Sequence, residues 1–141
     1  MSDDVRLFVY GSLLPGERDH ELMAGATLIG AARTQTGYKL IDLGVYPALL
    51  VGGDGSVAGE LYRIDKKQRF AIDVRKECPV LFHRTTVTLE DGSAAEVYAM
   101  RDDQVRGKRR IAGGDWKRRF EPRVRPDQAG ALTRWARKRF Q

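Results

Sequence analysis

The sequence predicts one α+β domain over residues 1–141, built as a small mixed β-barrel with short flanking helices. A chain of 141 residues suits a single core, because it buries about two thirds of its unfolded surface on folding. Six short runs rich in Val, Thr, Tyr and Leu are typical of strands. Only two stretches have the length and the capping residues of helices, so the sheet is expected to dominate.

The expected strands cover residues 7–10, 27–33, 37–43, 57–64, 84–89 and 94–100. Glu90, Asp91 and Gly92 separate the last two runs. Asp-Gly readily takes the positive φ values that tight hairpin turns require. We therefore expect the last two strands to form a hairpin.

A first helix is expected at residues 66–76. Asp65 precedes it as an N-cap and Pro79 follows it as a stop signal. Phe70 and Ala71 are the apolar residues expected to face the core. A shorter helix-like stretch is expected at residues 20–24.

A second helix is expected at residues 126–140, with Pro126 in its first turn. Leu132, Trp135 and Phe140 are spaced to form one apolar stripe. Arginine and lysine gather near its carboxyl end, where cations offset the helix dipole. Part of the positive charge of the chain therefore has a structural explanation.

The net charge of +6 is unevenly distributed. Residues 1–100 hold 11 Lys and Arg against 14 Asp and Glu, whereas residues 101–141 hold 14 against 5. Such a basic third can bind nucleic acid or another polyanion, because Lys and Arg neutralise phosphates. No recognition motif accompanies the charge, so a solvated arginine-rich face is the favoured interpretation.

The composition argues against metal, disulfide and membrane chemistry. Cys78 is the sole cysteine, and His20 and His83 are the only histidines, so we expect neither a metal site nor an internal disulfide. No apolar run approaches the roughly 20 residues that cross a bilayer. The first residues, MSDDVR, are acidic and polar, so a cytoplasmic protein is expected.

Residues 8–16 read FVYGSLLPG, a short apolar strand that runs into a glycine-containing turn. Consecutive backbone N–H groups of Tyr10, Gly11, Ser12 and Leu13 can point into one concavity there. Such a nest favours a carboxylate or another anion. This turn is the predicted ligand site.

Four segments in order resemble the γ-glutamylcyclotransferase-like family, which includes AIG2-like and BtrG-like proteins. They are YGSL at residues 10–13, YPAL at 46–49, ELYRI at 60–64 and GGDW at 113–116. The resemblance covers about residues 7–120. It implies the fold of that family, with the barrel architecture described above.

The resemblance also implies a reaction, cofactor-independent γ-glutamyl cyclotransfer by a transferase or lyase. The α-amine of a γ-glutamyl compound attacks its own γ-carbonyl and releases 5-oxoproline and a free amine. The turn formed by Tyr10, Gly11, Ser12 and Leu13 would bind the substrate carboxylate, and Tyr98 matches a family tyrosine near the pocket. A carboxylate would move the proton between the two amines.

The chain departs from the family pattern at that carboxylate. Alignment on Asp73, Pro79 and Phe82 places Lys76 at the expected glutamate and Glu77 at the usual glycine. The first hypothesis is that Glu77 is the catalytic base, reaching the pocket through an altered helix end. A shift of one residue rotates a side chain by about 100° on a helix, so the backbone must compensate.

Two alternatives remain open. Lys76 can be the base, because burial can lower the pKa of a lysine far enough. Otherwise the protein is a diverged, non-catalytic homologue that binds a small γ-glutamyl-like ligand. Ser12 as a nucleophile is disfavoured, because the sequence offers it no evident nearby base.

Overall fold

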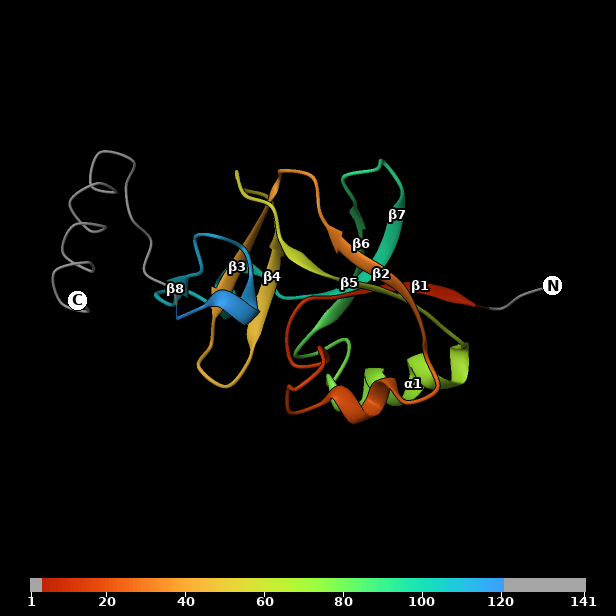
Figure 1. Ribbon diagram of the computed structural model, residues 1–141. Helices are drawn as coiled ribbons and strands as arrows, with labels where there is room; N and C mark the ends of the chain where they lie inside the picture. Colours follow the sequence, from red (N-terminus) through yellow and green to blue (C-terminus); the bar gives the residue numbers. More distant parts are fainter. Residues whose placement is uncertain (1–3, 121–141) are drawn as a thin grey trace, which may run out of the picture.

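The computed structural model describes residues 4–120, which form an eight-stranded mixed sheet with short helices around it (Figure 1). The strands are β1 (Val5–Val9), β2 (Thr27–Arg33), β3 (Tyr38–Asp42), β4 (Pro47–Val51), β5 (Ala58–Ile64), β6 (His83–Thr88), β7 (Ala94–Ala99) and β8 (Arg109–Arg110). The helices in this range are α1 (Lys66–Arg75) and the 3₁₀ helices η1 (His20–Met23), η2 (Asp102–Gln104) and η3 (Trp116–Arg118). The predicted α+β class is confirmed.

The strand order is β2-β5-β1-β7-β4-β3-β8, with β6 paired to β7. β1 is an interior strand, antiparallel to β5 and parallel to β7. An isolated bridge between Thr34 and Leu89 draws the end of β2 toward the β6–β7 hairpin. The sheet curls but stays open, because β2 and the two-residue β8 stand at opposite ends of its order. This open sheet corrects the predicted closure into a barrel.

The six expected strands correspond to β1, β2, β3, β5, β6 and β7. The hairpin between β6 and β7 is also present, with Gly92 at φ 86°. Two strands were not predicted. β4 begins at Pro47, and proline within an apolar run argues against a strand although it is allowed at a strand's first residue. β8 has only two residues, too few to give a strand pattern in the sequence.

Helix α1 begins and ends close to the predicted bounds. The Asp65 carboxylate accepts a hydrogen bond of 2.7 Å from the Gln68 N–H, as an N-cap does. The predicted inward face is wrong: Phe70 is 69% exposed and Ala71 is exposed, whereas Ile72 is fully buried. Of Phe70, Ala71 and Ile72, only Ile72 therefore reaches the core.

The short helix η1 lies beside α1 on one side of the sheet (Figure 1). The Gln68 amide donates to the carbonyl oxygens of Leu22 and Ala24, both at 3.0 Å. These bonds tie α1 to the segment that follows the β1 turn. The turn and the end of α1 are thereby held on the same side of the molecule.

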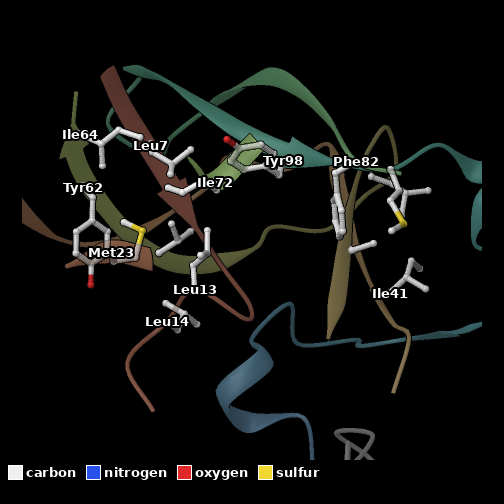
Figure 2. Packing of buried hydrophobic residues seen from close by; sticks show 14 of the residues in the cluster. Leu7, Leu13, Leu14, Met23, Ile41, Tyr62, Ile64, Ile72, Phe82 and Tyr98 are labelled. Atoms are coloured by element: carbon white, nitrogen blue, oxygen red, sulfur yellow. The ribbon is translucent and has the colours of Figure 1, made fainter. Parts of the chain in front are cut away.

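The core beneath these helices places β1, the turn and α1 in contact. Leu7, Leu13, Met23, Ile72 and Tyr98 belong to one buried cluster, and Figure 2 shows these side chains around the end of β1. Burying each large apolar side chain contributes about 1.5–3 kcal/mol. This packing fixes the position of the predicted ligand turn.

No helix within residues 4–120 has both the length and the apolar character needed to cross a membrane. The helix expected at residues 126–140 lies outside the described residues.

Candidate active site

The turn that follows β1 has two backbone hydrogen bonds of its own. The Leu14 N–H donates to the Gly11 carbonyl at 3.0 Å, and the Asp19 N–H donates to the Ser12 carbonyl at 2.9 Å. Neither bond uses the N–H groups of Gly11, Ser12 or Leu13. These are the donors that the predicted anion nest requires.

Gly11 is required by a close approach rather than by its φ angle. A Cβ atom at this position would lie 2.5 Å from Cγ of Pro47, the first residue of β4. Any side chain would therefore force the turn and β4 apart. The YGSL and YPAL segments of the sequence meet at this contact.

Tyr10 fastens the turn to two strands. Its hydroxyl donates to the Tyr98 carbonyl at 2.6 Å and accepts from the Leu49 N–H at 3.0 Å. Burial raises the pKa of Tyr10 strongly, although the hydrogen bond from Leu49 lowers it. The Tyr10 phenol is directed at the backbone, so it positions the turn.

Lys76 is the charged side chain that faces the turn. Its Nζ donates to Ser12 Oγ at 2.7 Å and lies 4.8 Å from the centre of the Phe82 ring and 5.9 Å from that of Tyr46. Only 9% of Lys76 is exposed. Burial lowers the pKa of Lys76 to about 8, although the nearby Asp19 charge raises it. A neutral amine is therefore accessible close to neutral pH.

Asp19 completes a buried polar cluster with Ser12 and Lys76. The Arg75 Nε donates to Asp19 Oδ1 at 3.0 Å. Burial raises the pKa of Asp19, but hydrogen bonds from Arg75 and Ser12 and the charge of Lys76 together hold it below its ordinary value. The sequence did not point to Asp19, because only the fold of the turn and η1 brings its carboxylate to Ser12.

Glu77 occupies the left-handed position just after α1. Its φ is 50°, and its N–H donates to the Val74 carbonyl at 3.1 Å. The Cys78 N–H reaches the Asp73 carbonyl at 3.0 Å, which completes a Schellman motif. This is a position that glycine normally takes, as the alignment of Glu77 with the family glycine suggests.

The side chain of Glu77 is exposed and does not line the cavity beside the turn. The structure therefore brings Lys76 to Ser12 and leaves Glu77 at the surface. A catalytic role for Glu77 stays a prediction, which the variants described below test.

Tyr98 lines the same cavity, but its hydroxyl has a partner in α1. It donates to Asp73 Oδ1 at 2.5 Å, and Arg84 Nε lies 2.9 Å from the same oxygen. Burial and the Asp73 hydrogen bond raise the pKa of Tyr98 strongly. The Tyr98 phenol is therefore neutral and is held toward the helix.

The cavity beside the turn is about 10 Å³, enough for roughly one water molecule. Its lining consists of Phe8, Val9, Tyr10, Gly11, Ser12, Leu13, Pro47, Lys76 and Tyr98. Lys76 forms one side of it. A small-molecule ligand needs far more room, so the Lys76 side chain must shift to admit one while its amine stays beside the turn. The rotatable bonds in its flexible stem allow this movement.

A larger hollow of about 670 Å³ lies between strands β2 and β5 and the segment around η3. Leu14 and Pro15, just past the turn, form part of its wall, and Arg33, Glu60 and Glu90 supply charges. The sequence did not predict this hollow, because its wall comes from segments far apart in the chain.

The arginines near β8 and η3 line another groove of about 550 Å³. Arg109 pairs with Asp42 at 3.0 Å, Arg110 with Asp54 at 2.6 Å and Arg119 with Glu17 at 3.3 Å. These pairs support the interpretation of a solvated arginine-rich face in the described part of the chain. Polyanion binding has no comparable support there.

Comparison with known proteins gives one consistent result. The family model "Gamma-glutamyl cyclotransferase, AIG2-like" matches residues 7–118. The YtfP family protein of Escherichia coli is 35% identical over 79% of this chain and 96% of its own length. A γ-glutamylaminecyclotransferase of Danio rerio is 32% identical over 67% of this chain and 68% of its own length.

Solved structures agree with this result. A Pyrococcus horikoshii protein, PH0828, aligns over 80% of this chain and 90% of its own with a TM-score of 0.66 and 29% identity. A mouse AIG2-like protein aligns over 69% of this chain and 77% of its own, with a TM-score of 0.64 and 27% identity. The chain therefore belongs to the AIG2-like γ-glutamyl cyclotransferase family.

Proposed function

We propose that this protein catalyses γ-glutamyl cyclotransfer without a cofactor, at the turn formed by residues 10–13, with Lys76 as the proton carrier. The products are 5-oxoproline and a free amine or amino acid. The observation that carries the proposal is the position of Lys76 Nζ, 2.7 Å from Ser12 Oγ and buried at the turn. The family of the chain supports the reaction class.

Substrate binding is assigned to the backbone of the turn and to the charge beside it. The N–H groups of Gly11, Ser12 and Leu13 form the nest for the glutamyl carboxylate. A protonated Lys76 adds a charge-assisted hydrogen bond while the ligand enters. The Danio rerio relative is named for γ-glutamylamines, and we extend that substrate class to this chain.

The chemistry needs one proton acceptor. Neutral Lys76 takes a proton from the α-ammonium of the substrate, and the freed amine attacks the γ-carbonyl carbon. The C–N bond to the leaving amine then breaks as Lys76 returns that proton to it. The attacking nitrogen gives up its second proton in turn, so the leaving amine departs as an ammonium and 5-oxoproline is neutral at its ring nitrogen. With the pKa of Lys76 at about 8, about a tenth of the protein carries neutral Lys76 at pH 7. Because attacking and leaving groups belong to one molecule, orientation supplies much of the rate.

A second candidate function is ligand binding without turnover. The 10 Å³ cavity favours it, because Lys76 closes the space in which a γ-glutamyl group would fold back. In that case the ammonium and the nest hold a small carboxylate, and no proton is moved.

The test is 5-oxoproline release from γ-glutamyl amino acids, γ-glutamylamines and glutathione. The wild type is compared with Lys76→Met, which removes the amine and keeps much of the length of the side chain, and with Glu77→Gln. Product from the wild type and from Glu77→Gln, but not from Lys76→Met, supports the proposal. Loss in Glu77→Gln alone assigns the base to Glu77. Calorimetric binding with no product from any substrate supports the second candidate.

A further inference from the structure

We infer that Ser12 and Lys76 form a serine–lysine dyad that transfers γ-glutamyl groups through an ester on Ser12 Oγ. The consequence is an additional activity, hydrolysis of γ-glutamyl amides whose α-amine is blocked and which cannot cyclise. The inference rests on the proposed function for its substrate class. Its nucleophile, its products and its test differ from those of the proposed cyclotransfer.

The geometry is that of a nucleophile with its base. Ser12 Oγ and Lys76 Nζ are 2.7 Å apart, within the hydrogen-bond reach that an activated hydroxyl requires. Ser12 is 3% exposed and Lys76 is 9% exposed, so water is largely excluded from the contact. The sequence alone offered Ser12 no base, and the fold supplies one from a position 64 residues away.

Lys76 Nζ is subject to influences of opposite sign. The aromatic rings of Phe82 and Tyr46 and the Asp19 carboxylate, which accepts a hydrogen bond from Arg75, favour the ammonium. Burial is the main influence on the pKa of Lys76 and lowers it to about 8.

The same turn offers donors for the oxyanion. The N–H groups of Ser12 and Leu13 take no part in the two backbone bonds that close the turn. Amides of the nucleophile and of its neighbour are a common way to stabilise the negative oxygen of a tetrahedral intermediate. Under the inference, the nest that binds an anion also binds the developing oxyanion.

The reaction balances without any co-reactant other than water. Ser12 Oγ bonds to the γ-carbonyl carbon while its proton passes to Lys76 Nζ. The C–N bond breaks, the leaving amine takes that proton, and a γ-glutamyl ester remains on Ser12. Water then attacks the ester carbon and gives a proton to Lys76. The C–O bond breaks, the proton returns to Ser12 Oγ, and the free γ-carboxyl group leaves and loses its own proton to solvent.

The decisive substrate is N-acetyl-γ-glutamyl-p-nitroanilide, because its blocked α-amine cannot attack the γ-carbonyl. We expect the wild type to release p-nitroaniline and N-acetylglutamate. Ser12→Ala and Lys76→Met should each lose at least about 100-fold in rate. Ser93→Ala, which alters a serine of the β6–β7 hairpin outside the cavity, is the matched control and should keep the wild-type rate.

No release by the wild type overturns the inference, as does an unchanged rate in Ser12→Ala. Measurement of 5-oxoproline from the unblocked substrate separates the two claims. Release of p-nitroaniline without any 5-oxoproline refutes cyclotransfer and keeps the dyad. Release of 5-oxoproline from the unblocked substrate, without release of p-nitroaniline from the blocked one, refutes the dyad and keeps cyclotransfer.

A second variant covers the case in which Ser12→Ala does not fold. Ser12→Cys combined with Cys78→Ser places a single thiol beside Lys76. A neighbouring ammonium lowers the pKa of a thiol, so iodoacetamide at pH 7 should alkylate the introduced thiol at least about tenfold faster than in the same protein carrying Lys76→Met. Equal alkylation rates overturn the pairing of Ser12 with Lys76.

Discussion

Lys76 and the arginines of β8 and η3 are cations in opposite settings. Lys76 is buried at the end of α1 and contacts a serine hydroxyl, and its pKa is lowered to about 8. Arg109 and Arg110 lie at an exposed sheet edge and pair with Asp42 and Asp54. The number of basic residues alone would mark the arginine-rich edge as the functional region. The burial of a charged side chain instead marks the site around Lys76. Chemistry at neutral pH needs a group that can lose its proton, which arginine does not do.

The largest expected effect is on turnover. Lys76→Met should lower kcat for 5-oxoproline release by at least about 100-fold, because it removes the proton carrier. Arg110→Met is the matched change at the arginine-rich edge and should leave kcat within about twofold, since its ion pair is exposed. A similar loss of kcat in both variants would contradict the proposed difference between the two regions.

The buried position of Lys76 also predicts how stability changes with pH. The pKa of Lys76 is about 8 in the folded protein and 10.5 in an unfolded chain, so the unfolded state binds more protons between these values. Its contribution to the free energy of unfolding therefore rises with pH across this window, by an amount on the order of 3 kcal/mol. Well below pH 7 both states are protonated and the contribution is constant.

The measurement is urea unfolding of the wild type and of Lys76→Met from pH 7 to pH 10. Subtracting the two curves removes the titration of the tyrosines, which also changes in this range. We expect the difference to favour the wild type increasingly above pH 8. A flat difference would mean that Lys76 is not desolvated, and the contrast with the exposed arginines would disappear.

A smaller effect is expected where the turn meets β4. Gly11→Ala places a Cβ atom 2.5 Å from Pro47 Cγ, so the turn must shift, at a cost of about 1–3 kcal/mol. Gly113→Ala in the arginine-lined groove meets no atom within 4 Å and should be tolerated. Urea unfolding measures both costs, and the KM for a γ-glutamyl-p-nitroanilide should rise only in Gly11→Ala. Equal stability of the two variants would contradict the close approach.

The sequence could predict the turn and its glycine because their signals are local. A short apolar strand before Gly11 and the order of four segments were sufficient. The alignment that put Lys76 at the family glutamate and Glu77 at the glycine agrees with the positive φ of Glu77. Local signals such as capping by Asp65 also predicted α1.

The inward face of α1 could not be predicted in the same way. Residues 66–75 carry few apolar side chains. From the sequence, a face formed by Phe70 and Val74 is as good a candidate for the core as the face that carries Ile72. Packing against η1 and β1 decides between them, and that packing depends on distant segments. The Asp19 carboxylate and the open edges of the sheet were unpredictable for the same reason.

Tyr98→Phe tests whether a tyrosine in the cavity contacts substrate. Because its hydroxyl is held by Asp73 at 2.5 Å, we expect a loss of about 1 kcal/mol in stability and less than about a threefold change in KM. Tyr62→Phe removes a comparable hydrogen bond to Glu60 away from the cavity and serves as the control. A rise in KM of about tenfold for Tyr98→Phe alone would instead assign it to substrate binding.

The smallest expected effect separates two neighbours in the chain, Lys76 and Glu77. Glycine takes a φ of 50° without the strain that a Cβ atom brings, so Glu77→Gly should raise the free energy of unfolding by up to about 1 kcal/mol. Glu77→Ala removes the same carboxylate and keeps the Cβ atom, so it should not be stabilised. Both variants should keep the wild-type kcat, because the Glu77 side chain is exposed. If both lose turnover while remaining folded, the exposed carboxylate must reach the turn during catalysis, and the assignment of the proton to Lys76 fails.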